Sequence, residues 1–174
     1  MSIARACDLI PPMTPAIKPA EVMREVDEAA RAAGSTDELM RSICERLHQR
    51  MLKYNWVGFY MIQDDADAGE RVLQLGRFVG SMTPHTRIRL NQGICGAAAS
   101  TGKTVVVDDV SKDQRYLACS SETKSEIVAP IFVRGQVVGE LDIDSHFPAA
   151  FTADDRKLVE HCAELVGRRL EKQG

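Results

Sequence analysis

The sequence predicts an α+β fold: one domain with a mainly antiparallel central sheet, helices from both ends of the chain packed on one face, and a ligand pocket on the other. Three observations lead to this prediction. The length of 174 residues suits a single domain with a hydrophobic core. Apolar residues recur at helical spacing near both ends of the chain. Between the ends, β-rich segments alternate with short turns, which is typical of hairpins.

The first helix is expected over residues 18–34. Pro19 stands in its first turn, where a missing N–H is harmless, and Gly34 is suited to end it. Residues 1–17 are rich in proline and lack periodicity, so they are predicted to form an N-terminal arm. The domain itself is therefore expected to cover residues 18–174.

The second helix is expected over residues 35–52. Ser35 and Glu38 have the spacing of a capping box, in which each side chain bonds the backbone near the other. Cys44 falls on the apolar face of this helix. We therefore expect Cys44 to be buried as a small hydrophobic residue.

The pattern in the central part of the chain predicts a series of short strands. Strands are expected within 55–62, 71–80, 85–90, 103–110 and 125–145. The last of these segments divides into two strands at Arg134-Gly135, a dipeptide suited to a tight hairpin turn. A short helix of small residues is expected over 91–102. A final helix over 152–173 carries Cys162 on its apolar face, where it is expected to be core.

Composition excludes several classes of function. The net charge is −3, which gives no electrostatic reason to bind nucleic acid or an anionic membrane surface. The apolar runs are too short to span a bilayer, and the N-terminus lacks the features of a signal peptide. A cytoplasmic location is the expectation.

The five cysteines are widely spaced and form no CxxC pair, so no metal site is predicted. His85, Cys95 and Cys119 could meet at a metal, but their spacing gives no support for it.

Two of the five thiols, Cys95 and Cys119, have distinctive surroundings. Cys95 lies between glycines in "GICG": either a helix start lowers the pKa of its thiol, or a small residue is needed in a crowded turn. Cys119 lies in a polar predicted loop, "LACSSETKSE", where a thiol could reach a small ligand.

Acidic residues interrupt two apolar strands. Glu126 stands in "SEIVAP", and Asp142 and Asp144 stand two apart in "ELDIDS", so the aspartates share one face of their strand. If that face lines the pocket, these carboxyls could donate a proton or hold an ammonium group. If it faces solvent, they are surface charges, and Glu140, with the same parity, suggests that part of the face is wet.

Aromatic residues in "NWVGFY" alternate in the same way. Trp56 and Tyr60 share one face of the expected strand. They would form an apolar wall if that face lines the pocket, and part of the sheet core otherwise.

Several of these motifs together resemble a known family. "NWVGFY", "LGRFVG", "GICG", "VVVDDV", "ACSSETKSEIVAPI" and "GELDIDS" occur in this order within residues 55–155. They resemble a GAF domain, and specifically the free methionine-(R)-sulfoxide reductase branch of that fold. The resemblance implies reduction of free methionine sulfoxide in a small closed pocket. It implies no bound cofactor, an external thiol reductant such as thioredoxin or glutathione, and a homodimer as a common state of such domains.

The resemblance also implies a role for each candidate residue. Cys119 matches the nucleophile and Cys95 a second family thiol. The remaining matches are substrate-binding: carboxyls that hold the ammonium and sulfoxide groups, and aromatic rings that enclose the methyl end, namely Glu126, Asp142, Asp144, Trp56 and Tyr60.

The sequence departs from the family pattern at His85. The family usually has there a further cysteine, which resolves the sulfenic acid formed on the nucleophile. Two other interpretations use the same fold: a non-catalytic GAF module that binds a small molecule, and a redox sensor with a Cys95–Cys119 disulfide.

Overall fold

A computed structural model describes residues 17–65, 69–118 and 120–173, and it contains one six-stranded sheet in the order β3-β2-β1-β6-β5-β4. Every neighbouring pair is antiparallel. The elements are α1 (Pro19–Ala32), α2 (Thr36–Arg50), β1 (Trp56–Asp65), β2 (Glu70–Val79), β3 (Arg87–Arg89), α3 (Gly93–Thr101), β4 (Val105–Val107), the short 3-10 helix η1 (Val110–Lys112), β5 (Ser125–Val133), β6 (Gln136–Ser145) and α4 (Ala153–Glu171). The predicted α+β class and antiparallel sheet are confirmed.

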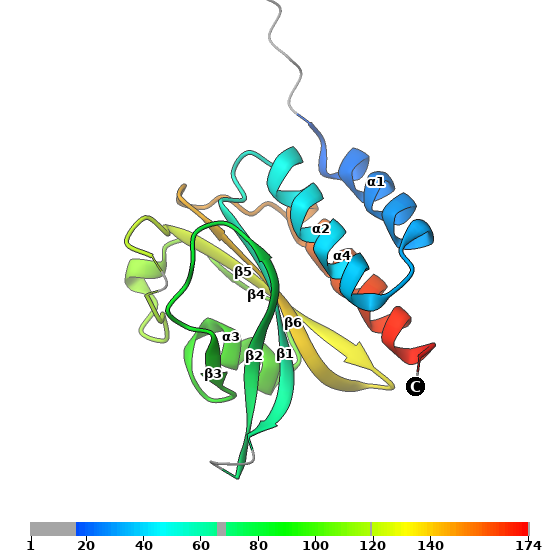
Figure 1. Cartoon of the computed structure of the whole chain (residues 1–174). Coiled ribbons are helices and arrows are strands. Elements are labelled where there is room, and N and C mark those ends of the chain that lie inside the picture. The colour runs from blue at the N-terminus through cyan, green and yellow to red at the C-terminus, as the bar shows by residue number, and fades with distance from the viewer. Residues whose placement is uncertain (1–16, 66–68, 119, 174) are drawn as a thin grey trace, which may run out of the picture.

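Helices α1, α2 and α4 lie together on one face of the sheet, and α3 lies on the opposite face (Figure 1). The core under the three helices combines their apolar stripes with the inward residues of β1, β5 and β6, such as Phe59, Ile127 and Leu141. Cys44 and Cys162 are buried in this core, as predicted. A second apolar cluster lies between the other face of the sheet and α3, and it includes Trp56.

The N-terminal caps of α2 and α4 use the residues that the sequence indicated, with one hydrogen bond to a different donor. Ser35 accepts a hydrogen bond from the backbone N–H of Glu38, as a capping box requires. The Glu38 carboxylate, however, accepts from the N–H of Gly34 instead of Ser35. Helix α4 has a complete capping box between Thr152 and Asp155.

The β5–β6 hairpin turns at Arg134 and Gly135, as expected. Both residues have positive φ, 49° and 78°, the backbone conformation of a two-residue turn whose twist matches that of the strands. The pairing that starts at this turn shifts by one residue between Ile131 and Phe132, and the shifted register sets the partners of the acidic motifs. Glu126 pairs with Asp144, and Val128 pairs with Asp142.

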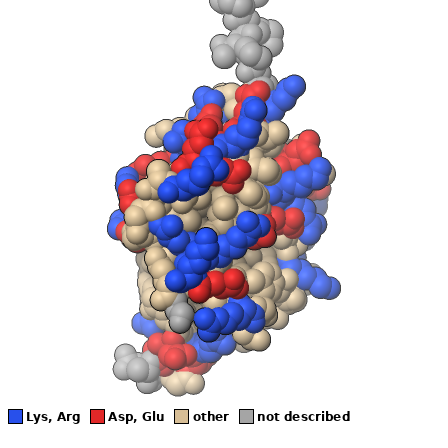
Figure 2. Space-filling model, turned by 90° about the vertical axis from the view of Figure 1, so that its right-hand side faces the viewer, with Lys and Arg blue, Asp and Glu red and all other residues tan. Residues whose placement is uncertain are grey.

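Charged side chains of both signs interleave over the face shown in Figure 2, without a patch of one sign. This agrees with the small net charge of −3. Within the described ranges, no helix combines the length and apolar composition that crossing a membrane requires.

Candidate active site

Strand register brings those predicted site residues that lie on strands to one face of the sheet, opposite α1, α2 and α4. Because side chains alternate along a strand, residues of one parity share a face, and antiparallel pairing then sets them side by side. Trp56 of β1 pairs with Asp144 of β6, which pairs on its other side with Glu126 of β5. Two steps along the same face, Tyr60 pairs with Glu140.

This face is dry. The exposed fractions are 5% for Glu126, 0% for Glu140, 3% for Asp142 and 5% for Asp144. The expectation that part of it is wet at Glu140 is therefore wrong, because α3 and the neighbouring loops cover the strand there. Both carboxyl oxygens of Glu140 and Oδ1 of Asp142 have no hydrogen-bond partner among the described residues.

Burial and mutual repulsion raise the pKa values of these carboxyls and so favour their neutral form. Burial, with the charges of Asp142 and Asp144, raises the pKa of Glu126 well above its ordinary value. Burial and Asp142 do the same to the pKa of Glu140. Burial also raises the pKa of Asp142 strongly, and that of Asp144 from 3.8 to about 7, although a hydrogen bond from Thr123 works in the other direction. The cluster thus holds exchangeable protons at neutral pH.

Cys95 is the thiol that the structure places in this cluster. It lies in the first turn of α3, 5% exposed, with Sγ 3.5 Å from Oδ2 of Asp142 and 4.0 Å from Oε1 of Glu126. Burial and the charges of Asp142, Glu140 and Glu126 raise its pKa well above 9.0. The interpretation in which the helix start lowers this pKa is wrong, because desolvation and the carboxyls outweigh the helix dipole.

The alternative interpretation of "GICG", a crowded turn, agrees with the structure. Gly93 has a φ of 73° and packs against Leu117, so a Cβ there would be both strained and crowded. A Cβ on Gly96 would lie 3.0 Å from the carbonyl oxygen of Arg89. Because both positions are glycine, α3 can pack closely against Leu117 and the backbone of Arg89. This packing places Cys95 against the carboxyls of the sheet.

Trp56 forms the wall of the site beside Asp144. Its ring lies 6.2 Å from that of Tyr60 and stacks on Phe78 at 5.7 Å, measured between ring centroids. The indole N–H donates to the carbonyl of Ser81, which fixes the ring orientation. The ring lies over Gly58, where an added Cβ would come within 2.2 Å of it.

His85 connects this wall to the loop of the predicted nucleophile. Tyr60 donates its hydroxyl proton to the backbone oxygen of His85 at 2.7 Å. Nε2 of His85 lies 3.3 Å from the backbone oxygen of Ala118. Cys119 itself lies outside the described residues.

A small cavity of about 50 Å³ opens beside Trp56 and Asp144. Loop residues close it, among them Met82, Ser120 and Thr123. Such a space holds only a few water molecules. An amino-acid ligand would therefore enter only with a movement of these loops.

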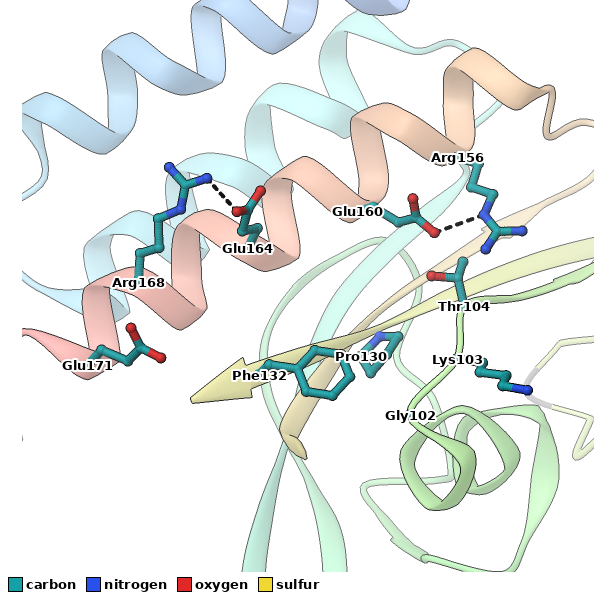
Figure 3. Close-up of a pocket in the computed structure, with 10 residues that line it drawn as sticks. All are labelled: Gly102, Lys103, Thr104, Pro130, Phe132, Arg156, Glu160, Glu164, Arg168 and Glu171. Atoms are coloured by element: carbon teal, nitrogen blue, oxygen red, sulfur yellow. Dashed lines mark hydrogen bonds and ion pairs between the residues drawn. The ribbon is translucent and has the colours of Figure 1, made fainter. Parts of the chain in front are cut away.

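A larger groove of about 900 Å³ lies elsewhere, between α4, β5 and the end of α3 (Figure 3). Its charged side chains neutralise each other, as Arg156 pairs with Glu160 and Arg168 with Glu164. These side chains are about half exposed, so their pairs are weak and solvated. Its charges are therefore already compensated, and the site of interest is the buried face described above.

The sequence-based prediction named Glu126, Asp142 and Asp144, which the structure brings together on this face, but it left Glu140 as a surface residue. Its parity with Asp142 and Asp144 was the available signal. Thr123, whose hydrogen bond lowers the pKa of Asp144, had no signal in the sequence. Among the described residues, one group of side chains could hold a metal ion: Cys95, Glu126 and Asp142. His85 is not in it.

Comparisons with known proteins agree with this architecture. A family model described as the GAF domain matches residues 35–170. Free methionine-R-sulfoxide reductase from Escherichia coli (strain K12) is 35% identical over 146 residues, 80% of this chain and 84% of the relative. The structure of free methionine-R-sulfoxide reductase from Neisseria meningitidis in complex with its substrate superposes with a TM-score of 0.81 and 31% identity, covering 89% of this chain and 90% of that one. GAF domain-containing protein A from Dictyostelium discoideum is 37% identical over 118 residues, 68% of this chain and 71% of the relative.

Proposed function

The chain belongs to the GAF-domain family, and we propose that within it the protein reduces free methionine-(R)-sulfoxide to methionine. One observation carries the proposal: buried carboxyls stand beside a fixed indole wall on one sheet face. Free methionine sulfoxide presents an ammonium group, a polar S=O group and an apolar methyl end. The pocket offers a matching surface for each.

In this proposal the acidic residues bind the polar groups of the substrate, and the aromatic residues enclose its methyl end. Glu126 and Asp144, paired across two strands, hold the substrate ammonium, because they ionise readily beside a positive charge. Asp142 keeps its proton and donates it toward the sulfoxide oxygen. Trp56 and Tyr60 contact the methyl end.

Cys119 is the proposed nucleophile. Its chain neighbours support the assignment, since Ser120 lines the cavity next to Asp144, and Ala118 contacts His85. The Cys119 thiolate attacks the sulfoxide sulfur. The oxygen passes from methionine to the cysteine with a proton from the pocket. The sulfoxide is reduced to methionine, and the thiol is oxidised to a sulfenic acid.

Regeneration consumes two external thiols. The first condenses with the sulfenic acid, which releases water and leaves a mixed disulfide, and the second displaces Cys119 as a thiol. Cys95 could condense instead, but its raised pKa leaves little thiolate. We therefore assign recycling to a reductant such as glutathione or a thioredoxin-type protein. His85 stands at the position where the family resemblance expects a resolving cysteine. Dependence on such thiols favours the reducing cytoplasm.

The test is turnover of the two epimers of free methionine sulfoxide with dithiothreitol. We expect consumption of the R epimer by the purified protein and by Cys44→Ser, a buried thiol in the other core. We expect none by Cys119→Ser. Absence of turnover with every thiol reductant would refute the proposed enzymatic activity. Ligand binding without turnover would favour a non-catalytic GAF module.

A further inference from the structure

Glu140 has no part in the proposed reaction, although it is the most buried carboxyl of the site. Among the described residues, no donor lies within hydrogen-bonding geometry of its two oxygens or of Oδ1 of Asp142, and the Cys95 thiol is the neighbour whose contact lowers the pKa of Glu140. Buried polar groups without partners are rare in native proteins and often lie where an ion or water binds. Both residues adjoin the Cys95 thiol.

We propose that Cys95, Glu126, Asp142 and Glu140 form a binding site for a thiophilic divalent cation of the Zn²⁺ class. We call these four residues the cation cluster. The proposed reduction does not need the cation, and the site does not depend on that reaction.

The distances suit tetrahedral coordination. With Zn–S near 2.3 Å and Zn–O near 2.1 Å, ligand atoms of a tetrahedral site lie about 3.4–3.6 Å apart. Sγ of Cys95 lies 3.5 Å from Oδ2 of Asp142 and 4.0 Å from Oε1 of Glu126. All three ligand atoms lie within 4.8 Å of one another. These three side chains meet the distance requirement, and small side-chain movements would complete the geometry. We assign the fourth position to the buried Glu140 carboxyl, which lies on the same face of β6 as Asp142 and acts on the pKa of Cys95.

The chemistry of the donors selects the cation. A thiolate binds Zn²⁺, Cd²⁺ and Co²⁺ well, whereas Mg²⁺ and Ca²⁺ prefer oxygen ligands and retained water. No Lys or Arg forms an ion pair with Glu126, Glu140 or Asp142 in the part of the chain that the structure describes. A divalent cation would supply the missing positive charge and use the unpartnered oxygens.

If the proposed function holds, the cation and the substrate compete. Glu126 and Asp142 belong to both the cation cluster and the substrate site, so one occupant excludes the other. Zn²⁺ is then expected to raise KM for methionine sulfoxide without lowering kcat. This part rests on the proposed function, whereas direct cation binding does not.

The experiment titrates Cd²⁺ into the full chain, reduced with a phosphine, and follows the ultraviolet charge-transfer absorption of the thiolate–Cd²⁺ bond. Zn²⁺ affinity is then measured by displacement of Cd²⁺. We expect the absorption in the unmodified protein, in Cys119→Ser and in Cys44→Ser, and its loss in Cys95→Ser. Asp142→Asn and Glu140→Gln retain every thiol, and each is expected to weaken Cd²⁺ binding at least 10-fold.

The two amide variants keep the test decisive if Cys95→Ser does not fold, which circular dichroism will show. No absorption in the unmodified protein, absorption that persists in folded Cys95→Ser, or its loss in Cys119→Ser would each overturn the site. Unchanged affinity in both amide variants would also overturn it. Failure of the proposed function appears differently, as absent turnover in metal-free protein with an unchanged Cd²⁺ titration.

Discussion

Asp144→Asn tests whether the buried carboxyls are held neutral at a cost in stability. Asp144 is 5% exposed, and its pKa rises from 3.8 to about 7 in the folded protein. Between these two pH values the folded state binds a proton that the unfolded state has released. Stability therefore falls as pH rises through this window and is unaffected by Asp144 below pH 3.8.

The magnitude follows from the width of the window. At about 1.4 kcal/mol for each pH unit, a rise from 3.8 to about 7 corresponds to about 4 kcal/mol. Asparagine has nearly the shape of a neutral carboxyl and does not ionise. Asp144→Asn should therefore match the unmodified protein near pH 3.5. It should become more stable by about 2–4 kcal/mol at pH 7 and above, the lower figure allowing for compensation within the coupled cluster.

The assay is denaturant unfolding of both proteins at several pH values between 3.5 and 8. Asp64→Asn, an exposed carboxylate on the same strand as Trp56, is the matched control and should show no such trend. A stability difference that does not change with pH would refute the reasoning. So would an Asp144→Asn variant less stable than the unmodified protein at pH 7.

Two further substitutions separate the pocket from the helix-covered core. Gly58→Ala places a Cβ 2.2 Å from the Trp56 ring, so it should lower the unfolding free energy by about 1–3 kcal/mol and raise KM several-fold. Gly76→Ala, whose Cβ would meet only a backbone oxygen at 3.3 Å, is its control, and equal effects of the two would contradict the argument. Asp155→Ala removes the acceptor of the Tyr54 hydroxyl and of the partly exposed Lys53, which should cost about 2–3 kcal/mol in urea unfolding. Turnover by the folded protein should not change, and a loss of kcat would show that this core is coupled to the site.

Periodicity was sufficient to predict the elements of this fold, because both ends of the chain and the hairpins obey simple rules. The 3.6-residue period placed Cys44 and Cys162 on core faces, and the Arg134-Gly135 dipeptide marked the β5–β6 turn. It did not predict the one-residue register shift between Ile131 and Phe132 that sets the pairing of the acidic residues. Parity then placed Asp142 and Asp144 on one face. Which face is buried depends on α3, whose packing is a tertiary property that no local pattern encodes.

The two wrong expectations share this physical origin. Glu140 was expected in water because a glutamate in an alternating strand is usually solvated. One of the two interpretations left open for Cys95 gave it a low pKa, because helix starts stabilise anions. In both cases the packing of α3 onto the sheet removes water and adds neighbouring carboxyls, and desolvation then dominates the local rule.

The same desolvation suits this face to binding a cation, although the buried carboxyls lower the stability of the fold. Ionised carboxyls would repel each other in this dry cluster, and their raised pKa values reflect the free-energy cost of ionising them without a ligand. A cationic ligand lowers that cost when it binds, whether it is an ammonium group or a divalent metal ion. Neutral analogues of the same shape gain nothing from this relief. On the two proposals above, the cluster therefore favours positively charged ligands over neutral ones, and Glu140, which the proposed reaction does not use, adds to that preference.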